Sequence, residues 1–188
     1  MSTSEKIADR RLAWLTNQGW EFDGALRWCE SPIEQLVTAT LMAYSGWSQY
    51  PEPYLLASHG ENLLADSGVC ATHKRLFKDS DLIIVQAEVR LPRTTRYRLD
   101  MALFAGEDKF AVEYDGHDFH EKTKEQARKD KARDRALTLA GWRVLRFTGS
   151  EVFASPEGVV EQLHDAASEA NARGYQRWLA DRKAAGTE

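Results

Sequence analysis

Three acidic residues, Asp100, Glu113 and Asp115, lie in strand-like segments, and two histidines, His117 and His120, follow them closely. Glu113 and Asp115 are two residues apart, so in a β-strand their side chains point to the same face, roughly 7 Å apart. Carboxylates gathered in this way repel one another unless a proton or a cation lies among them. Mg²⁺ typically binds one or two carboxylates while keeping waters and phosphate oxygens. The spacing therefore indicates metal-dependent chemistry on phosphate esters; the alternative is a solvated sheet face.

Three strand-like runs position these acids: "LIIVQAEVRL" (82–91), "RYRLDMALF" (96–104) and "KFAVEYD" (109–115). The short turn-forming connections "PRTT" and "AGED" predict an antiparallel meander. Period-two alternation assigns one face of the second strand to Tyr97, Leu99, Met101 and Leu103, and the other to Arg98, Asp100 and Ala102. On the third strand it assigns one face to Phe110, Val112 and Tyr114, and the other to Ala111, Glu113 and Asp115. Antiparallel pairing then brings Asp100 close to Glu113.

Helical patterns surround these strands. Ser31 and Pro32 predict the start of a helix over "SPIEQLVTATLMAY" (31–44), and a second helix is expected over 123–140. The run "WRVLRF" (142–147) is a fourth strand, which a helical crossover allows to lie parallel to its neighbour. A long amphipathic helix is expected from Pro156 onward, with short helices near 62–65 and 71–77. The predicted fold class is α/β, a mixed central sheet flanked by helices.

Composition excludes several other classes of protein. The chain is 43% hydrophobic and 29% charged with a net charge of −4, and it has neither an apolar run of 18 residues nor a signal-peptide pattern. Cys29 and Cys70 lack zinc-site spacing. We therefore expect a cytoplasmic protein without membrane contact. Residues 121–135 carry seven basic and four acidic side chains, a local excess that favours a polyanionic partner; the alternative is a solvated helix face laced with i,i+4 pairs.

Four segments together resemble the PD-(D/E)XK nuclease superfamily, and in detail its very-short-patch-repair-like branch of small endonuclease domains. They are "YRLD" (97–100), "EYDGHDFH" (113–120), "RDRAL" (133–137) and "GWRVLRF" (141–147). The resemblance covers about residues 31–152 and implies a restriction-endonuclease-like core of order αβββαβ there. The remainder is expected to be a helical N-terminal extension (1–30) and a C-terminal helix (153–188) of a single domain (1–188).

The resemblance also implies roles for individual residues. Asp100 and Glu113 would bind the metal, Mg²⁺ or Mn²⁺, helped by a backbone carbonyl near Tyr114. Glu34 would correspond to a first-helix glutamate that assists through a water or the metal. Its alternative is a capping box, in which Glu34 bonds back to the Ser31 amide.

Asp115 departs from the superfamily pattern, because a lysine is usual at this position. Asp115 itself is then a candidate metal ligand. Other candidate replacements are lysines reaching back into the site (Lys122, Lys124 or Lys129) or a histidine that moves the proton, since imidazole titrates near neutral pH. We favour His120 as base or phosphate ligand, with His117 as a second candidate.

Two further side chains are candidates near this site. Arg133 lies in line with the core-facing stripe of its helix, and we expect it to contact Asp130, the histidines or the substrate, or else to lock helix to sheet as an ion pair. Gln86, on the first strand, is a candidate for orienting an acid or a water.

The predicted function is a metal-dependent endodeoxyribonuclease that hydrolyses DNA in repair, restriction or phage defence. Two alternatives stay open: a non-catalytic nucleic-acid-binding or interaction module of the same fold, because the lysine is missing, and an RNA-cleaving toxin.

Overall fold

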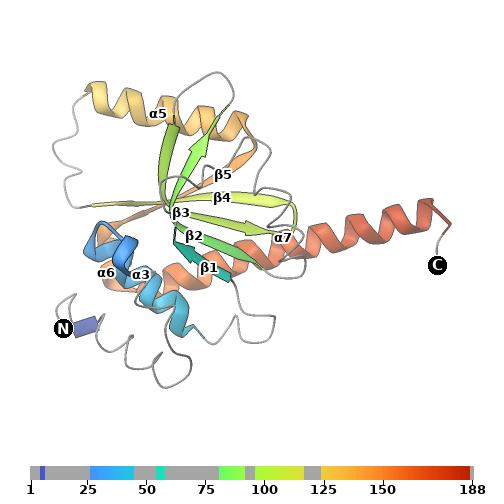
Figure 1. The fold of residues 1–188 in the computed structure, drawn as a ribbon, viewed down its shortest axis with the longest axis horizontal. Helices are drawn as coiled ribbons and strands as arrows, with labels where there is room; N and C mark the ends of the chain where they lie inside the picture. The colour runs from blue at the N-terminus through green and yellow to red at the C-terminus, as the bar shows by residue number, and fades with distance from the viewer. Residues whose placement is uncertain are drawn as a thin grey trace.

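The computed structural model describes residues 5–6, 26–44, 54–57, 81–91, 96–116 and 124–186. Its elements are, in order, α3 (Pro32–Ala43), β1 (Tyr54–Ala57), β2 (Leu82–Arg90), β3 (Arg96–Ala105), β4 (Asp108–Asp115), α5 (Lys124–Leu139), β5 (Trp142–Thr148), α6 (Gly149–Ala154) and α7 (Pro156–Ala184). Figure 1 shows three layers, with α5 on one face of the sheet and α3, α6 and α7 on the other. This mixed α/β arrangement is compatible with the expected restriction-endonuclease-like core.

The sheet has five strands in the order β1-β2-β3-β4-β5. β2, β3 and β4 form an antiparallel meander, and β5 pairs parallel with β4 after the α5 crossover. Both arrangements were predicted, and the four predicted strands are confirmed to within one residue at each end. β1, which pairs parallel with β2, and the short helix α6 were not predicted. The short helices expected near 62–65 and 71–77 lie outside the described residues, as does most of the N-terminal extension.

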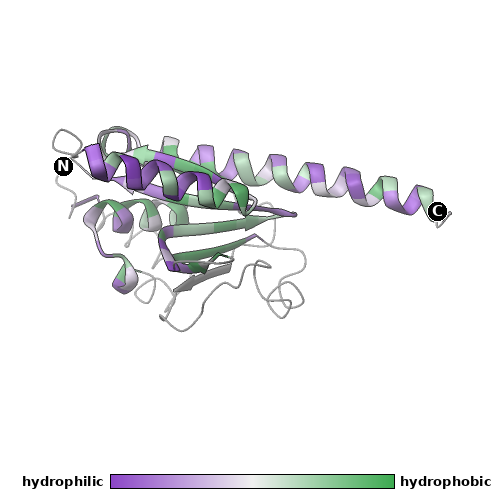
Figure 2. Cartoon of the chain, turned by 90° about the horizontal axis from the view of Figure 1, so that it is seen from above, coloured by the Kyte–Doolittle hydropathy of each residue, from purple (hydrophilic) through white to green (hydrophobic). Residues whose placement is uncertain are grey.

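Each face of the sheet buries its own hydrophobic core. The α7-side core includes Leu36 and Val37 of α3, Val85 of β2, Met101 of β3 and Leu163 of α7. The α5-side core is smaller and gathers around Leu137, the one buried residue within the fully described helix α5. Figure 2 shows the difference, since α5 is hydrophilic over most of its surface whereas the strands are largely hydrophobic. The sheet is therefore anchored mainly through its α7 side.

Side-chain alternation changes at one level of β2 and β3. Val85 and Met101, which are register partners, lie in the α7-side core, whereas Ala87 and Leu99, also register partners, lie in the α5-side core. The prediction that Leu99 shares a face with Met101 is therefore wrong. The break coincides with Gln86, whose φ of 54° is in the left-handed region that interrupts regular strand geometry. On β4 the alternation holds, with Phe110, Val112 and Tyr114 all in the α7-side core.

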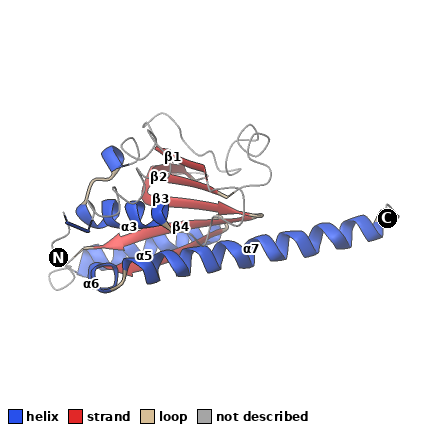
Figure 3. Cartoon of the chain, turned by 90° about the horizontal axis from the view of Figure 1, so that it is seen from below, coloured by secondary structure: helices blue, strands red, loops and turns tan. Residues whose placement is uncertain are grey.

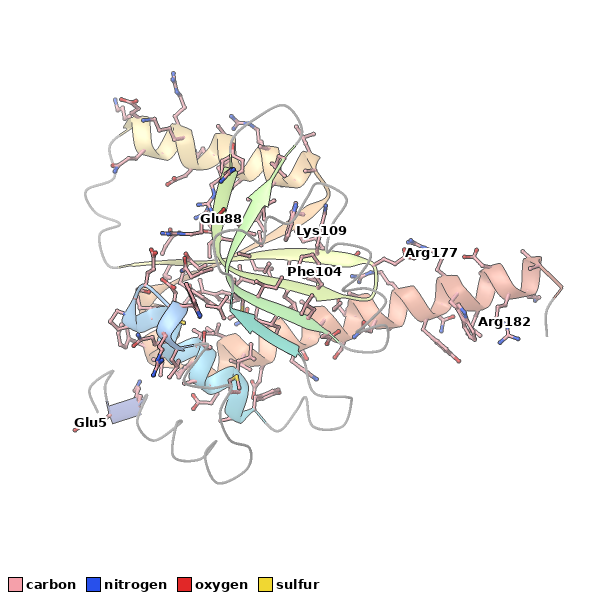
Figure 4. The ribbon with its side chains drawn as sticks, viewed as in Figure 1. Glu5, Glu88, Phe104, Lys109, Arg177 and Arg182 are labelled. Atoms are coloured by element: carbon pink, nitrogen blue, oxygen red, sulfur yellow. The ribbon has the colours of Figure 1, made fainter. Side chains whose placement is uncertain are left out.

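Helix α7 is the longest element, with 29 residues, and it begins where the Ser155 hydroxyl accepts from the Gly158 amide. Figure 3 shows it running beneath the sheet and then extending beyond it. Where α7 passes the β3–β4 turn, Arg173 contacts Asp108 at 2.6 Å and Arg177 pairs with Glu107. Figure 4 shows Arg177 at this crossing and Arg182 further out along the helix. No helix in the described part of the chain is long and apolar enough to span a membrane.

Candidate active site

Asp100 lies where β3 and β4 separate. The β3–β4 pairing runs as far as Met101↔Val112, and just beyond it the Tyr114 amide donates to Asp100 Oδ2 at 2.8 Å. The Asp100 carboxylate thus accepts from a backbone amide of β4 in place of a backbone carbonyl. Burial, opposed by the hydrogen bond from the Tyr114 amide and aided by the charge of Glu34, raises the pKa of Asp100 to about 6.

Glu113 is buried, with 6% of its surface exposed, and it faces α5. Arg133 Nη2 of that helix donates to Glu113 Oε1 at 2.5 Å. Burial and then the charge of Asp100 raise the pKa of Glu113 to about 8, although Arg133 and Arg146 both favour the ionised form. Asp100 is therefore close enough for its charge to oppose the ionisation of Glu113, as antiparallel pairing predicted.

Glu34 approaches the same place from the first turn of α3. Its carboxylate accepts three hydrogen bonds: from the Glu30 amide at 2.9 Å, the Ser31 hydroxyl at 2.8 Å and Gln86 Nε2 at 2.5 Å. The Ser31 hydroxyl in turn accepts from the Glu34 amide. The helix-cap alternative is thus realised in part, with the Glu30 amide where the Ser31 amide was expected. Because the charge of Glu34 acts on Asp100, the cap does not separate Glu34 from the acids.

Gln86 holds Glu34 from the sheet. The left-handed backbone at Gln86 accompanies a switch in strand alternation, and the Gln86 side chain reaches α3 instead of continuing the pattern set by Ile84. A non-glycine residue in this conformation costs about 1–3 kcal/mol, which the surrounding structure must supply. The sequence had indicated Gln86 as a candidate to orient an acid, and this contact is confirmed.

Arg146 was not foreseen. It is the register partner of Glu113 on β5, and its guanidinium reaches Asp115 at 3.4 Å and Asp134 at 2.6 Å. It therefore places a positive charge beside Asp115, where the superfamily usually has a lysine. A signal was present in the sequence, because a half-buried arginine in a short strand between Leu145 and Phe147 needs an acidic partner.

The remaining candidate residues include one that contacts the site, two that are exposed on α5 and three that the structure does not describe. Arg133 contacts Glu113 and the Arg98 carbonyl, so it links α5 to the sheet as the ion-pair alternative expected. Lys129 pairs with Glu125 at 3.1 Å and both side chains are largely exposed, while Lys124 is exposed at the start of α5. His117, His120 and Lys122 lie outside the described residues.

A divalent cation fits the chemistry of the two coupled carboxylates. Among the described residues no group of three or more acidic, histidine or cysteine side chains is placed to hold a metal. Asp100 and Glu113 nevertheless offer hard oxygen ligands, and their raised pKa values show that both resist ionisation together. Mg²⁺ needs only one or two carboxylates, so this pair suffices as a donor set.

Comparison with known families supports the same assignment. Residues 83–167 match the model of a restriction endonuclease family, REase_MTES_1575. The match covers less than half of the chain, including β3, β4, α5 and β5 but not Glu34. No curated protein and no solved structure matches the chain. This part of the chain is thus supported as a restriction-endonuclease-like domain, which indicates a nuclease with DNA as its substrate; such domains typically use divalent metals.

Proposed function

We propose that this protein is a metal-dependent endonuclease that hydrolyses DNA phosphodiester bonds, using Mg²⁺ or Mn²⁺. One observation carries the proposal: where β3 and β4 part, the half-buried carboxylate of Asp100 opposes the ionisation of the buried carboxylate of Glu113. In a free-standing protein this is unfavourable, and a bound cation would relieve it. The pair lies inside the segment that matches the endonuclease family.

In the proposed mechanism Asp100, Glu113 and the backbone carbonyl of Tyr114 hold the cation. When bound, a divalent ion lowers the pKa of water and stabilises the charge that develops on the phosphoryl oxygens. Glu34, fixed by three hydrogen bonds, assists beside Asp100. On the basis of the sequence alone, His120 would act as base or phosphate ligand with His117 beside it, while Asp115 is a further candidate ligand.

Two arginines supply positive charge that the missing lysine does not. Arg133 and Arg146 each contact an acid of the site, and both keep a buried Nε–H that has no acceptor among the described residues. Buried donors are nearly always satisfied, so an unpaired one calls for an acceptor. An anionic oxygen of the substrate is one that the proposed reaction would bring.

The motif order favours the very-short-patch-repair-like branch of the superfamily. In that case the chain would form a single nuclease domain with helical additions at both ends. Roles in repair, restriction and phage defence are all compatible with this activity.

The test is cleavage of supercoiled plasmid by the purified protein with Mg²⁺ or Mn²⁺, with EDTA and an RNA substrate as parallel arms. We expect chelator-sensitive nicking of DNA, and a loss of at least about 100-fold in D100N and E113Q, because each removes charge that positions the cation. D165N is the matched control, since Asp165 on α7 is 80% exposed. Equal cleavage by D100N and the wild-type protein would overturn the proposal.

One observation favours a second candidate, a non-catalytic DNA-binding module. Arg133 and Arg146 already neutralise part of the acidic charge without any metal. If the wild-type protein binds duplex DNA in a salt-sensitive way and never cuts it, this candidate replaces the first.

A further inference from the structure

The outer side of α5 carries a continuous basic stripe. Its members are Lys124, Arg128, Lys131 and Arg135, spaced by four, three and four residues. At about 100° per residue, they fall within roughly 60° of one another on the helix. All four are exposed. We call these four residues the α5 stripe.

The α5 stripe points away from the sheet. Leu137 marks the inward side of the helix, because it is fully buried in the α5-side core. The same helical geometry places the stripe roughly opposite Leu137 and Arg133. Figure 4 shows side chains with nitrogen tips projecting from this outer side of α5. The stripe is thus a surface separate from the candidate active site, although one helix carries both.

The charges of the stripe have no acidic partner among the residues that the structure describes. None of the four forms an ion pair within the described part of the chain, whereas Lys129 on the flank of α5 pairs with Glu125. Elsewhere Arg143 and Arg146 also have acidic partners. Four neighbouring cations repel one another, so an arrangement that leaves them unpaired favours a polyanionic ligand.

The charge of the whole chain makes this local excess more distinct. The chain has 25 basic and 29 acidic side chains, so the stripe leaves 21 against 29 in the remainder. The remainder of the chain is therefore net negative, whereas this face of α5 is positive. Such asymmetry orients a charged ligand before contact.

We propose that the α5 stripe binds the phosphate backbone of duplex DNA, as a second contact beside the carboxylate site. The stripe is about 16 Å long, since a helix rises about 1.5 Å per residue. Phosphates of one strand advance about 3.4 Å along the duplex axis, so several lie within this length. α5 carries no aromatic side chain on which unpaired bases would stack, which favours duplex over single strands. The inference rests on the proposed DNA substrate.

The test compares two triple variants in the D100N background, with EDTA, so that no DNA is cut. One variant is R128Q/K131Q/R135Q on α5; the matched control is R177Q/R182Q/K183Q on α7, which removes the same charge. Binding of a 30-base-pair duplex would be followed by fluorescence anisotropy at several salt concentrations. Each phosphate contact contributes about 0.9 to the slope of log K against log salt, so the α5 variant should lose about 2–3 of slope. The α7 control should keep the slope of its parent.

The outcomes separate this inference from the proposed function. Three results would overturn the inference about the α5 stripe. They are an unchanged slope in the α5 variant, an equal fall of the slope in both variants, and no duplex binding by the parent. If the stripe governs binding but the wild-type protein never cuts DNA with Mg²⁺ or Mn²⁺, the stripe stands and the nuclease proposal fails. If D100N abolishes cleavage and the slope of the α5 variant is unchanged, the nuclease proposal stands and the inference about the α5 stripe fails.

Discussion

At the scale of single residues, the candidate site is defined by acidic side chains whose ionisation is opposed by burial and by neighbouring negative charge. Asp100 and Glu113 both lie in a mostly buried setting. The charge of Asp100 raises the pKa of Glu113, and the charge of Glu34 raises the pKa of Asp100. Neither Arg133 nor Arg146 fully offsets this effect. The stability of the metal-free protein should therefore depend on pH in a direction set by these groups.

We expect the free energy of unfolding to decline as pH rises. The pKa of Glu113 is about 8 in the folded protein against an ordinary 4.5, so between these values the folded state keeps a proton that the unfolded chain has lost. The native state binds more protons over this interval, and stability accordingly falls through it. Asp100 adds to the decline at lower pH, up to about 6. Urea unfolding in EDTA from pH 5 to pH 9 measures this slope.

E113Q provides the decisive comparison, because glutamine keeps the shape but does not titrate. Its unfolding free energy should be less dependent on pH between 6 and 9 than that of the wild-type protein. Mn²⁺ should stabilise the wild-type protein more at pH 8.5 than at pH 5.5, since metal ligands must lose their protons. The same pH slope in E113Q and in the wild-type protein would show that Glu113 is not the group responsible.

The sequence predicted which acids come together but not what holds them. Period-two alternation and short connections suffice to place Asp100 near Glu113. The contacts of Arg133 and Arg146 depend on how far long side chains reach across a helix and two strands, which strand spacing does not determine. Gln86 was a candidate from its place on the first strand, and its contact with Glu34 involves a backbone angle that no pattern in the sequence signals.

At the scale of elements, α5 depends on few interior contacts. Of its 16 residues, all of them described, only Leu137 is buried, and Arg133 adds an ion pair to Glu113. By contrast, β3 and β4 each bury five residues. The position of α5, and with it of Arg133 and the α5 stripe, therefore depends strongly on one leucine.

L137A should cost about 2–5 kcal/mol of unfolding free energy, because it leaves a cavity where the side chain is fully enclosed. L139A is the matched control on the same helix: Leu139 is 89% exposed, so its loss should stay within about 0.5 kcal/mol. Chemical denaturation of both variants gives the comparison. Similar costs for the two would mean that Leu137 does not anchor α5.

The elements were more predictable than the details of their pairing. The long periodic patterns of α3, α5 and α7 and the alternation of β2 to β5 gave their positions closely. β1 has only four residues, "YLLA", too few to distinguish a strand from a helix by periodicity. The shift of faces between Met101 and Leu99 escaped prediction because alternation was taken to continue unbroken.

At the scale of the whole molecule, α7 joins the helical layer to the far end of the sheet. Its backbone passes so close to the β3–β4 turn that a Cβ at Gly106 would lie 2.7 Å from the Ala170 carbonyl oxygen. Gly106 also has a φ of +54°, which disfavours other residues. Glycine therefore permits both the turn and the helix contact.

G106A should be more destabilising than G141A. Gly141 has a φ of +80°, but its nearest neighbour, Lys109 Cε, is 3.6 Å away, so only the backbone cost of about 1–2 kcal/mol applies there. At Gly106 a clash with the backbone of α7 adds to that cost, and we expect at least about 1 kcal/mol more. Thermal unfolding of the two variants tests this, and equal losses would indicate that α7 can shift freely away from the turn.

The left-handed backbone conformation of Gln86 couples the thermal stability of the protein to the orientation of the Glu34 carboxylate. Glycine would suit the left-handed angle best, and it lacks the amide that Glu34 accepts from. A change to glycine would thus relieve the backbone at this position and would also remove a hydrogen bond that orients the Glu34 carboxylate. Glutamine at this position keeps the hydrogen bond to Glu34 at the cost of an unfavourable backbone angle.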